Sequence, residues 1–223
     1  MVLELVIAGF FVQGATPLEA ARDRQDRPTL EKFLRENEAA AAKAPNDAEA
    51  QYRCALAASY LAEVDQELRD KKAARVAAEV GIKAAERAVA LKPDDAENYR
   101  VLGTLCGQAI TDLMSGLTYG PRAKDAIAKA VSRAPNSSMV YVARGVGNFY
   151  LPPQLGGGLE TAVVDFRKAI ELDPRNAEAY LWLGLSLRKE NKDAEARRAF
   201  EKSLALNPNS VWVKQQLAKT PAK

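Results

Sequence analysis

One repeated unit near the C-terminus constrains the fold of this chain more than any other feature. The segment AEAYLWLGLSLRKENKDAEARRAFEKSLALNP runs from residue 177 to residue 208. Its apolar residues recur at helical spacing in two blocks separated by the polar stretch KENKD, which predicts two antiparallel amphipathic helices. Small residues at Gly184 and Ala196 would let the two helices approach closely, and Pro208 would end the second helix.

The same pattern recurs three times upstream, with aromatic, small and proline residues at matching positions. These positions are Tyr141, Gly145, Ala162, Phe166, Ala169 and Pro174, then Tyr99, Leu102, Gly103, Ala123, Ile127, Ala130 and Pro135, and more loosely Ala55, Gly81, Ala85, Ala88 and Pro93. The pattern resembles the tetratricopeptide repeat, although Ser203 stands where that family has alanine. The resemblance implies an all-α, right-handed α-solenoid of stacked helix-turn-helix repeats.

We therefore expect a solenoid over residues 29–219, with repeats at 46–93, 94–135, 136–175 and 176–209 and a closing helix at 210–219. A lone helix, capped by Thr29 and stopped by Pro45, would precede the first repeat. Residues 1–28 are expected to be a signal-like or disordered segment. The run from Val2 to Val12 is apolar except for Glu4 and is too short to span a bilayer.

That apolar run resembles the core of a secretory signal, with Gly14 at a possible cleavage point. It lacks the basic residues that usually lead such a signal. We expect an exported, periplasmic protein. The alternative is a cytoplasmic protein whose apolar N-terminus packs on the body of the fold.

The first three repeats carry insertions between their two helices. The span between the paired small residues is twelve residues in the last repeat, and seventeen, twenty and twenty-six in the three repeats before it. The first insertion contains neither glycine nor proline, so we expect it to lengthen both helices by about seven residues. The second, TDLMSGLTYGPRAK, is expected to form a loop. All three would share one edge, which either binds a partner or has drifted without function.

The third insertion, LPPQLGGG, contains three consecutive glycines before a predicted helix. It lacks the lysine of a phosphate-binding loop and the third glycine of a dinucleotide-binding loop, and no strand precedes it. We interpret it as a joint, in which Pro152 and Pro153 end one helix and the glycines allow positive φ.

Composition excludes several classes of function. The chain has no histidine, which removes the commonest general base and most zinc sites. The balance of 32 basic and 29 acidic residues gives no concentrated charge for nucleic acid. Cys54 and Cys106 lack metal-ligand spacing, and we expect two buried free thiols. We predict no catalytic residues, no metal and no cofactor.

The remaining prediction is a protein-binding surface. In tetratricopeptide proteins the first helices line a concave face that typically holds a peptide. Matching positions here are Arg53 (or Tyr52, depending on the register of the first repeat), Arg100, Thr104, Val142, Val146, Phe149, Leu181, Leu185 and Arg188. This groove, apolar with arginines at its ends, suits a partner segment with apolar and some acidic side chains. The resemblance thus implies a non-catalytic scaffold for a protein or peptide partner.

Two questions stay open at this point. A ligand- or solute-binding accessory subunit of an envelope transport system is the alternative function, which an enclosed cavity would favour.

Arg144 occupies a core position where the repeat has leucine. We expect a local slip of register or a snorkelling side chain there, rather than an anchored ion pair.

Overall fold

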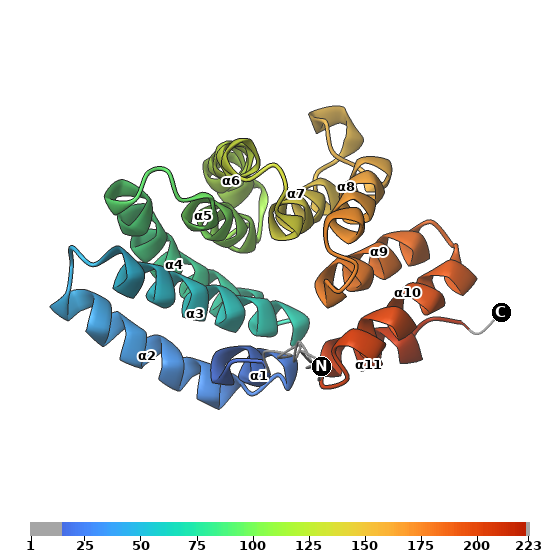
Figure 1. Cartoon of the computed structure of the whole chain (residues 1–223), viewed down its shortest axis with the longest axis horizontal. Coiled ribbons are helices and arrows are strands. Elements are labelled where there is room, and N and C mark those ends of the chain that lie inside the picture. The colour runs from blue at the N-terminus through green and yellow to red at the C-terminus, as the bar shows by residue number, and fades with distance from the viewer. Residues whose placement is uncertain (1–14, 222–223) are drawn as a thin grey trace, which may run out of the picture.

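The computed structural model describes residues 15–221, and helices are the regular secondary structure of that part of the chain (Figure 1). The elements are α1 (Pro17–Asp23), α2 (Arg27–Lys43), α3 (Ala48–Glu67), α4 (Lys71–Leu91), α5 (Ala96–Gln108), α6 (Leu113–Arg133), α7 (Ser138–Tyr150), the 3-10 turn η1 (Pro153–Leu155), α8 (Leu159–Leu172), α9 (Ala177–Lys189), α10 (Asp193–Leu206) and α11 (Val211–Ala218). Four antiparallel pairs, α3–α4 to α9–α10, stack side by side in a curved array. The predicted all-α solenoid is confirmed.

Close approach of the two helices explains the small residues of the repeat pattern. A Cβ atom added at Gly145 would lie 2.5 Å from the ring of Phe166, and one added at Gly184 would lie 2.6 Å from the ring of Phe200. Both rings are fully buried. Glycine in the first helix therefore makes room for the aromatic ring of the second, and the ring fills the space between them.

The first insertion lengthens both helices of its repeat, as predicted. Helix α3 has 20 residues and α4 has 21, compared with 13 in α9 and 14 in α10. Each helix of the first repeat is therefore seven residues longer. Without glycine or proline in the segment, nothing in the sequence interrupts either helix before the turn at 68–70.

The second insertion is helical, and the prediction of a loop was wrong. Asp112 and Ser115 form a capping box that starts α6 ahead of both glycines and of Pro121, which lies inside the helix. Proline removes one backbone donor there, and the carbonyl that loses it belongs to Leu117, which is 66% exposed. Water can replace that donor on an exposed turn, so the cap outweighs the proline.

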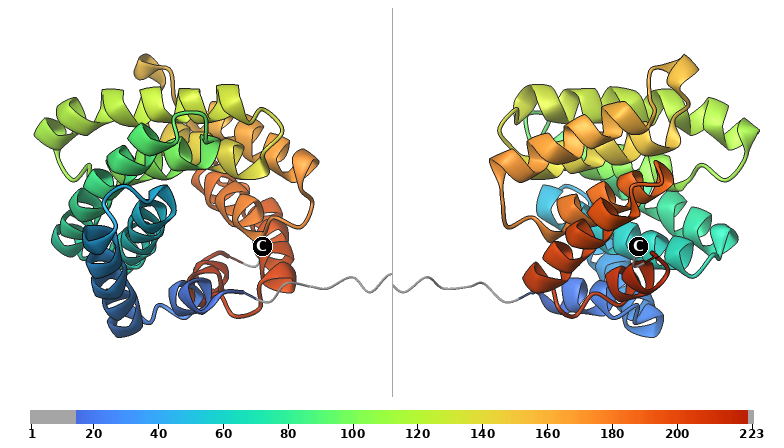
Figure 2. Two further views of the ribbon diagram at one scale, coloured as in Figure 1. Left: turned by 60° about the vertical axis from the view of Figure 1, so that its left-hand side comes forward. Right: turned by 90° about the vertical axis from the view of Figure 1, so that its right-hand side faces the viewer.

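The third insertion is a joint, as predicted. Helix α7 ends at Tyr150, and the chain turns through η1 into α8. Gly156 and Gly158 adopt φ values of 86° and 108°, which side chains with a Cβ rarely tolerate. The α3–α4 turn, the start of α6 and this joint all project from the same side of the molecule (Figure 2, right).

The interpretation of Arg144 as slipped or snorkelling was wrong. Its Nε donates to Oδ1 of Asp165 at 3.0 Å, and the Asp165 side chain is only 4% exposed. Asn148 donates to the other carboxylate oxygen at 2.8 Å. The register holds, because Gly145 still faces Phe166, and a buried acid compensates the arginine. Sequence patterns reveal such a partner poorly because it lies on another helix.

The two cysteines agree with the sequence prediction, whereas the N-terminal helices differ from it. Cys54 and Cys106 are free and buried, as predicted. Helix α2 starts at Arg27 and is capped by Asp26, three residues before the expected cap Thr29, and it ends before Pro45. Residues 17–23 form α1, although segment 1–28 was predicted to be signal-like or disordered. The apolar run Val2–Val12 lies outside the described residues.

Candidate functional site

The two ends of the helix array touch each other. The amide of Asn207 donates to Oδ2 of Asp23 at 2.8 Å, and the amide of Gln215 donates to Oε1 of Gln25 at 3.2 Å. Asp23 ends α1, whereas Gln215 lies in α11. The array therefore curls round until its first helix meets its last, and the concave face becomes the inside of a closed ring (Figure 2, left).

A small pocket lies on this inner face where the ends meet. It has a volume of about 50 Å³ and is lined by residues of α1, α3, α9, α10 and α11. We call it the concave pocket. Among its lining residues one arginine, Arg22, accompanies four acids, Asp23, Glu63, Glu67 and Glu178. By residue type the pocket is therefore acidic.

Two of the four acids have polar partners and two do not. Arg22 pairs with Asp23 at 2.9 Å and its guanidinium lies 4.6 Å from the ring centroid of Tyr60. Gln25 donates to Oε2 of Glu67 at 2.7 Å. The side chains of Glu63 and Glu178 make no hydrogen bond and no ion pair with any residue in the described range 15–221.

Enclosure of the pocket disfavours negative charge in it. Burial is the main cause that raises the pKa of Glu63 above its ordinary value, and the charge of Arg22 partly opposes the shift. Burial also raises the pKa of Glu67, and the nearby charge of Glu63 adds to that effect. A cation placed between these groups would stabilise their charged forms. The pocket is therefore suited to a positively charged guest.

The first insertion supplies two of these acids. A first helix as long as α9, starting at Ala48, would end at Tyr60. Glu63 and Glu67 lie beyond that point, on the seven-residue extension of α3, one helical turn apart. The extension reaches the place where α1 packs, so the inserted residues build one wall of the pocket.

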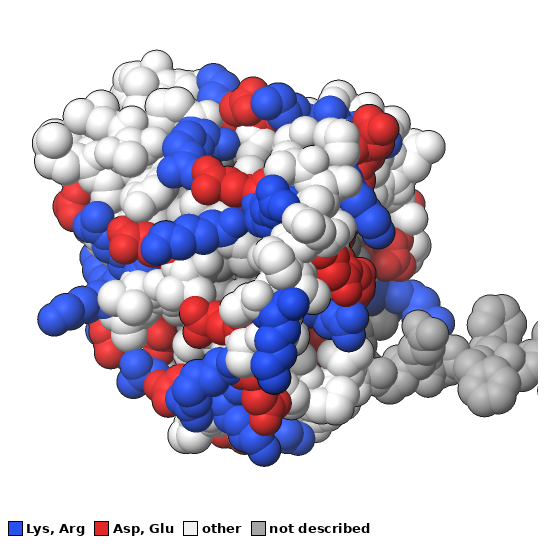
Figure 3. Space-filling view, turned by 90° about the vertical axis from the view of Figure 1, so that its left-hand side faces the viewer, with Lys and Arg blue, Asp and Glu red and all other residues white. Residues whose placement is uncertain are grey.

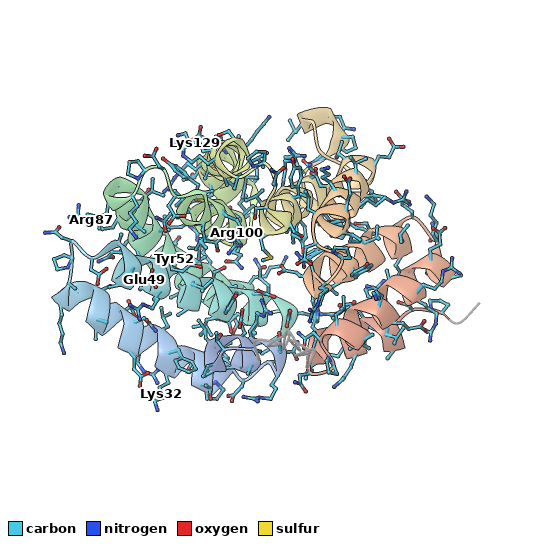
Figure 4. The ribbon with its side chains drawn as sticks, in the orientation of Figure 1. Lys32, Glu49, Tyr52, Arg87, Arg100 and Lys129 are labelled. Atoms are coloured by element: carbon cyan, nitrogen blue, oxygen red, sulfur yellow. The ribbon has the colours of Figure 1, made fainter. Side chains whose placement is uncertain are left out.

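A second polar group lies on the inner face between α3 and α5. The hydroxyl of Tyr52 donates to Oε1 of Glu97 at 3.1 Å, and Nε of Arg100 donates to Oε2 of the same carboxylate at 2.7 Å. Figure 4 shows Tyr52 and Arg100 towards the middle of the ring, whereas Lys32, Arg87 and Lys129 lie on its outside. The Arg100 side chain is only 11% exposed and its charge is balanced by Glu97.

The five apolar residues predicted for the groove lie mainly in the packing between helices. Val142, Leu181 and Leu185 are buried. Val146 and Phe149 are partly buried and pack beside them. Of the five, Leu181 lines the concave pocket.

The four polar predictions occupy different environments. Arg100 lies on the inner face, as described, and Thr104 is half-buried on the same helix. Arg53 is exposed and pairs with Glu49 at 3.4 Å. Arg188 donates to the side-chain oxygen of Gln216 at 2.7 Å and to its backbone carbonyl at 3.1 Å, which ties α9 to the closing helix.

Sequence reasoning missed Arg22, Glu63, Glu67 and Glu178. The repeat template places no residue of α1 and none of the α3 extension, so it could not bring these side chains together. One signal was present. Thr16 and Glu19 have the spacing of a capping box, which predicts the start of a helix, and the structure shows both of its hydrogen bonds.

The described residues offer neither a metal-binding cluster nor a membrane-spanning helix. Within 15–221 no group of three or more acidic or cysteine side chains could hold a metal ion. None of the helices in that range is both long and apolar enough to cross a bilayer. The polar groups of the inner face include carboxyl, guanidinium, amide, phenol and aliphatic hydroxyl groups.

Comparison with known families gives the same repeat. A family model described as "TPR repeat" matches residues 155–189, and one described as "Tetratricopeptide repeat" matches residues 177–210. The small glutamine-rich tetratricopeptide repeat-containing protein 2 of Mycosarcoma maydis is 30% identical over 105 residues, which is 47% of this chain. This chain therefore contains tetratricopeptide repeats at residues 155–210. It covers only 28% of the length of that fungal relative.

A solved structure shows the same fold at low sequence identity. A thermophilic TPR protein of Thermus thermophilus superposes with a TM-score of 0.61 at 19% identity, over 90% of this chain and 97% of its own. A MamA structure (residues 41 to the end) from Desulfovibrio magneticus gives a TM-score of 0.48 at 18% identity, over 87% of this chain and 97% of its own. Tetratricopeptide repeat proteins generally mediate protein–protein interactions, and their fold typically serves as a non-catalytic scaffold.

Proposed function

We propose that this tetratricopeptide repeat protein is a non-catalytic scaffold that binds a partner protein on its concave face, with a cationic side chain of the partner in the concave pocket. The observation that carries the proposal is the state of Glu63 and Glu178. Both are half-buried at the concave pocket, and neither side chain makes a hydrogen bond or an ion pair within the described residues. A lysine or arginine from another chain would supply such a partner.

We propose a basic partner segment in place of the partly acidic one expected from the sequence. That expectation rested on the arginines predicted at the ends of the groove. Arg100 is balanced by Glu97, and Arg188 is held by Gln216 of the closing helix. The groups that lack partners are acids, so the electrostatic match is with a basic segment.

We propose that α1 moves away from α11 to admit the partner. Helix α1 has seven residues, and two side-chain hydrogen bonds join its end to the C-terminal helices. Each such bond stabilises the closed ring by about 0.5–1.5 kcal/mol. Separation of α1 from α11 is therefore inexpensive compared with unfolding of the protein, and it would open the concave face to a partner.

The alternative function, a solute-binding accessory subunit of an envelope transport system, needs an enclosed cavity. The closure of the ring favours this alternative function, but the small volume of the concave pocket does not. Small-molecule sites usually measure about 300–1,000 Å³, whereas the concave pocket has about 50 Å³. A single side chain of a protein partner fits this space better than a whole solute.

The proposal can be tested by affinity capture from the native host with a photoreactive amino acid in place of Tyr60, whose ring lies against the pocket residue Arg22. Glu63→Gln together with Glu178→Gln removes the two unpaired charges. Glu38→Gln with Glu195→Gln removes two exposed charges elsewhere and is the matched control. We expect the pocket variant to lose the captured protein by at least about tenfold, since two charge contacts disappear, and the control to retain it.

Equal capture by the pocket variant and the control would refute this assignment. A crosslinked partner peptide without lysine or arginine would also refute it, because the pocket would then hold a different kind of side chain. The melting temperature of both variants is measured first, so that loss of folding is not mistaken for loss of binding.

We also propose that the chain is exported, on the basis of the apolar run from Val2 to Val12 and the small residue Gly14. Mass spectrometry of the protein purified from a periplasmic or secreted fraction should then give a mature chain that begins near Ala15. A cytoplasmic protein that retains Met1 or Val2 would contradict export.

A further inference from the structure

The start of α6 carries apolar side chains into solvent, outside the ring and away from the concave pocket. Leu113, Met114 and Leu117 are 78%, 71% and 66% exposed, and Ile110 just before the helix is 38% exposed. We call these four residues the α6 tip. No charged residue occurs from 113 to 120. An uncharged lobe is visible at the upper left of Figure 3, in the place where Figure 2 (left) shows α6 beginning.

The tip exists because of the second insertion. Helix α6 has 21 residues, whereas its partner α5 has 13, so the first turns of α6 extend past the helix that should cover them. The tip is therefore a convex projection with no apolar neighbour on its outer side. A projection of this shape suits insertion into a soft surface better than it suits the reception of another helix.

Basic side chains lie beside the tip on α4. Nη1 of Arg75 is 3.6 Å from Oδ2 of Asp112, and the hydroxyl of Tyr119 donates to Oε1 of Glu79 at 3.1 Å. These contacts place the start of α4 against the start of α6. Lys71 and Lys72 precede Arg75 by four and three residues, so they lie on the same face of α4 as Arg75.

Three of these cations are not neutralised by the protein. Arg69, Lys71 and Lys72 are exposed and form no ion pair with any residue of the described range. Arg75 differs, because it pairs with Glu79 at 2.9 Å and also contacts Asp112. The neighbourhood of the tip thus has an excess of positive charge.

Two further apolar residues connect the cations to the tip. Leu68, at the α3–α4 turn, is 49% exposed, and Val76, one turn after Lys72, is 58% exposed. This edge therefore combines exposed leucine, methionine and valine with uncompensated lysine and arginine. Apolar side chains that enter the acyl boundary, next to cations that contact headgroups, form the combination that anionic lipid surfaces attract.

We infer that this edge docks on an anionic lipid surface, with the α6 tip inserted and Arg69, Lys71 and Lys72 on the headgroups. The inference does not depend on the concave pocket or its partner. A second copy of the chain fits less well as the occupant. In a two-fold symmetric pair the same cations from both copies would face each other without acids to balance them.

Co-sedimentation of the full chain with vesicles tests the inference. The vesicles are made of phosphatidylcholine alone or of phosphatidylcholine with phosphatidylglycerol, at low and high salt. We expect the protein to sediment with the anionic vesicles and to be released by salt. Lys71→Gln with Lys72→Gln should weaken the binding about 25-fold, or about fivefold for each cation. Leu113→Ser, Met114→Ser and Leu117→Ser together should weaken it at least about tenfold.

Matched controls are available on other parts of the surface. Lys43→Gln with Lys202→Gln removes two exposed cations, and Val164→Ser removes an exposed apolar side chain that is 66% accessible. Both controls should bind as the original chain does. All five affected tip and lysine positions are exposed, so the melting temperature should stay nearly constant.

The inference is overturned if the protein does not sediment with anionic vesicles, or if it binds neutral vesicles equally well. It is also overturned if the tip variants bind vesicles as the controls do. Light scattering tests whether a second copy of the chain, in place of lipid, covers this surface. A dimer of the original chain that the tip variants convert to a monomer would assign the surface to a second copy and refute the lipid assignment.

Discussion

Gly145 and Gly147 lie two residues apart in α7. We expect replacement by alanine to have opposite effects on the stability of the protein at these two positions. A Cβ at Gly145 would lie 2.5, 2.8 and 2.9 Å from three ring atoms of Phe166, whereas ordinary contacts of this kind are 3.4–4 Å. The ring would have to move by about 1 Å, and it is fully buried. A Cβ at Gly147 would meet nothing within 4 Å, and that position is exposed.

The expected magnitudes follow from two opposing contributions. Replacement of glycine by alanine inside a helix stabilises it by roughly 0.5–1 kcal/mol. Overpacking of a core destabilises it by about 1–3 kcal/mol. Gly145→Ala should therefore lower the free energy of unfolding by about 1–2 kcal/mol, because the clash exceeds the helix gain. Gly147→Ala should raise it by about 0.5–1 kcal/mol, because only the helix gain remains.

Urea denaturation followed by far-ultraviolet circular dichroism measures both changes, and each kcal/mol should move the melting temperature by about 2–4 °C in a chain of this length. Phe166→Leu provides the test of mechanism. A smaller side chain leaves room for the new methyl group, so Gly145→Ala should cost less in the Phe166→Leu background. The reasoning is refuted if Gly145→Ala is as stable as Gly147→Ala, or if its cost is unchanged by Phe166→Leu.

Three further predictions follow from buried polar groups. Burial raises the pKa of Glu63, so the folded protein binds a proton that the unfolded chain releases above about pH 4.5. The free energy of unfolding should therefore fall as pH rises from 4.5 towards the raised value, and Glu63→Gln should flatten this fall in pH-dependent urea titrations. Burial raises the pKa of Cys54 and Cys106 to about 11. A thiol reagent at pH 8 should therefore label them only at the rate of unfolding. Fast labelling of the native protein would contradict their burial. Arg144→Ala should destabilise the protein by about 1–3 kcal/mol because it removes a partner of buried Asp165, and Asp165→Asn in the same chain should recover part of the loss in thermal melts.

Much of the fold could be predicted because the two helices that pack together in each repeat are also close together in the sequence. The residues that contact each other therefore belong to one short pattern. Gly145 and Phe166 are 21 residues apart, and Gly184 and Phe200, at the same positions of the repeat pattern, are 16 apart. Helix lengths in the first insertion followed from the absence of glycine and proline. The same rule failed in the second insertion, because the reciprocal bonds of Asp112 and Ser115 started α6 before its glycines and Pro121.

The candidate site was harder to predict because it depends on how the whole array curves. The template placed Leu181 and Leu185 on an open groove, but the closing of the ring and the packing of neighbouring helices bury both. Asp23 and Asn207 are 184 residues apart, and no pattern in the sequence links them. Their contact follows from the accumulated rotation of many helix pairs.

The sequence by itself determined the repeat, the order of the helices, the buried thiols and the joint at Gly156–Gly158, because each depends on residues within one or two helices. The tertiary structure decided that the ring closes and that Glu63 and Glu178 share a pocket with Arg22. It also decided that the α6 tip is left uncovered beside three free cations. Small rotations between successive pairs sum along the array, and their sum brings α1 against α11. That sum is a property of the complete array and of no single repeat.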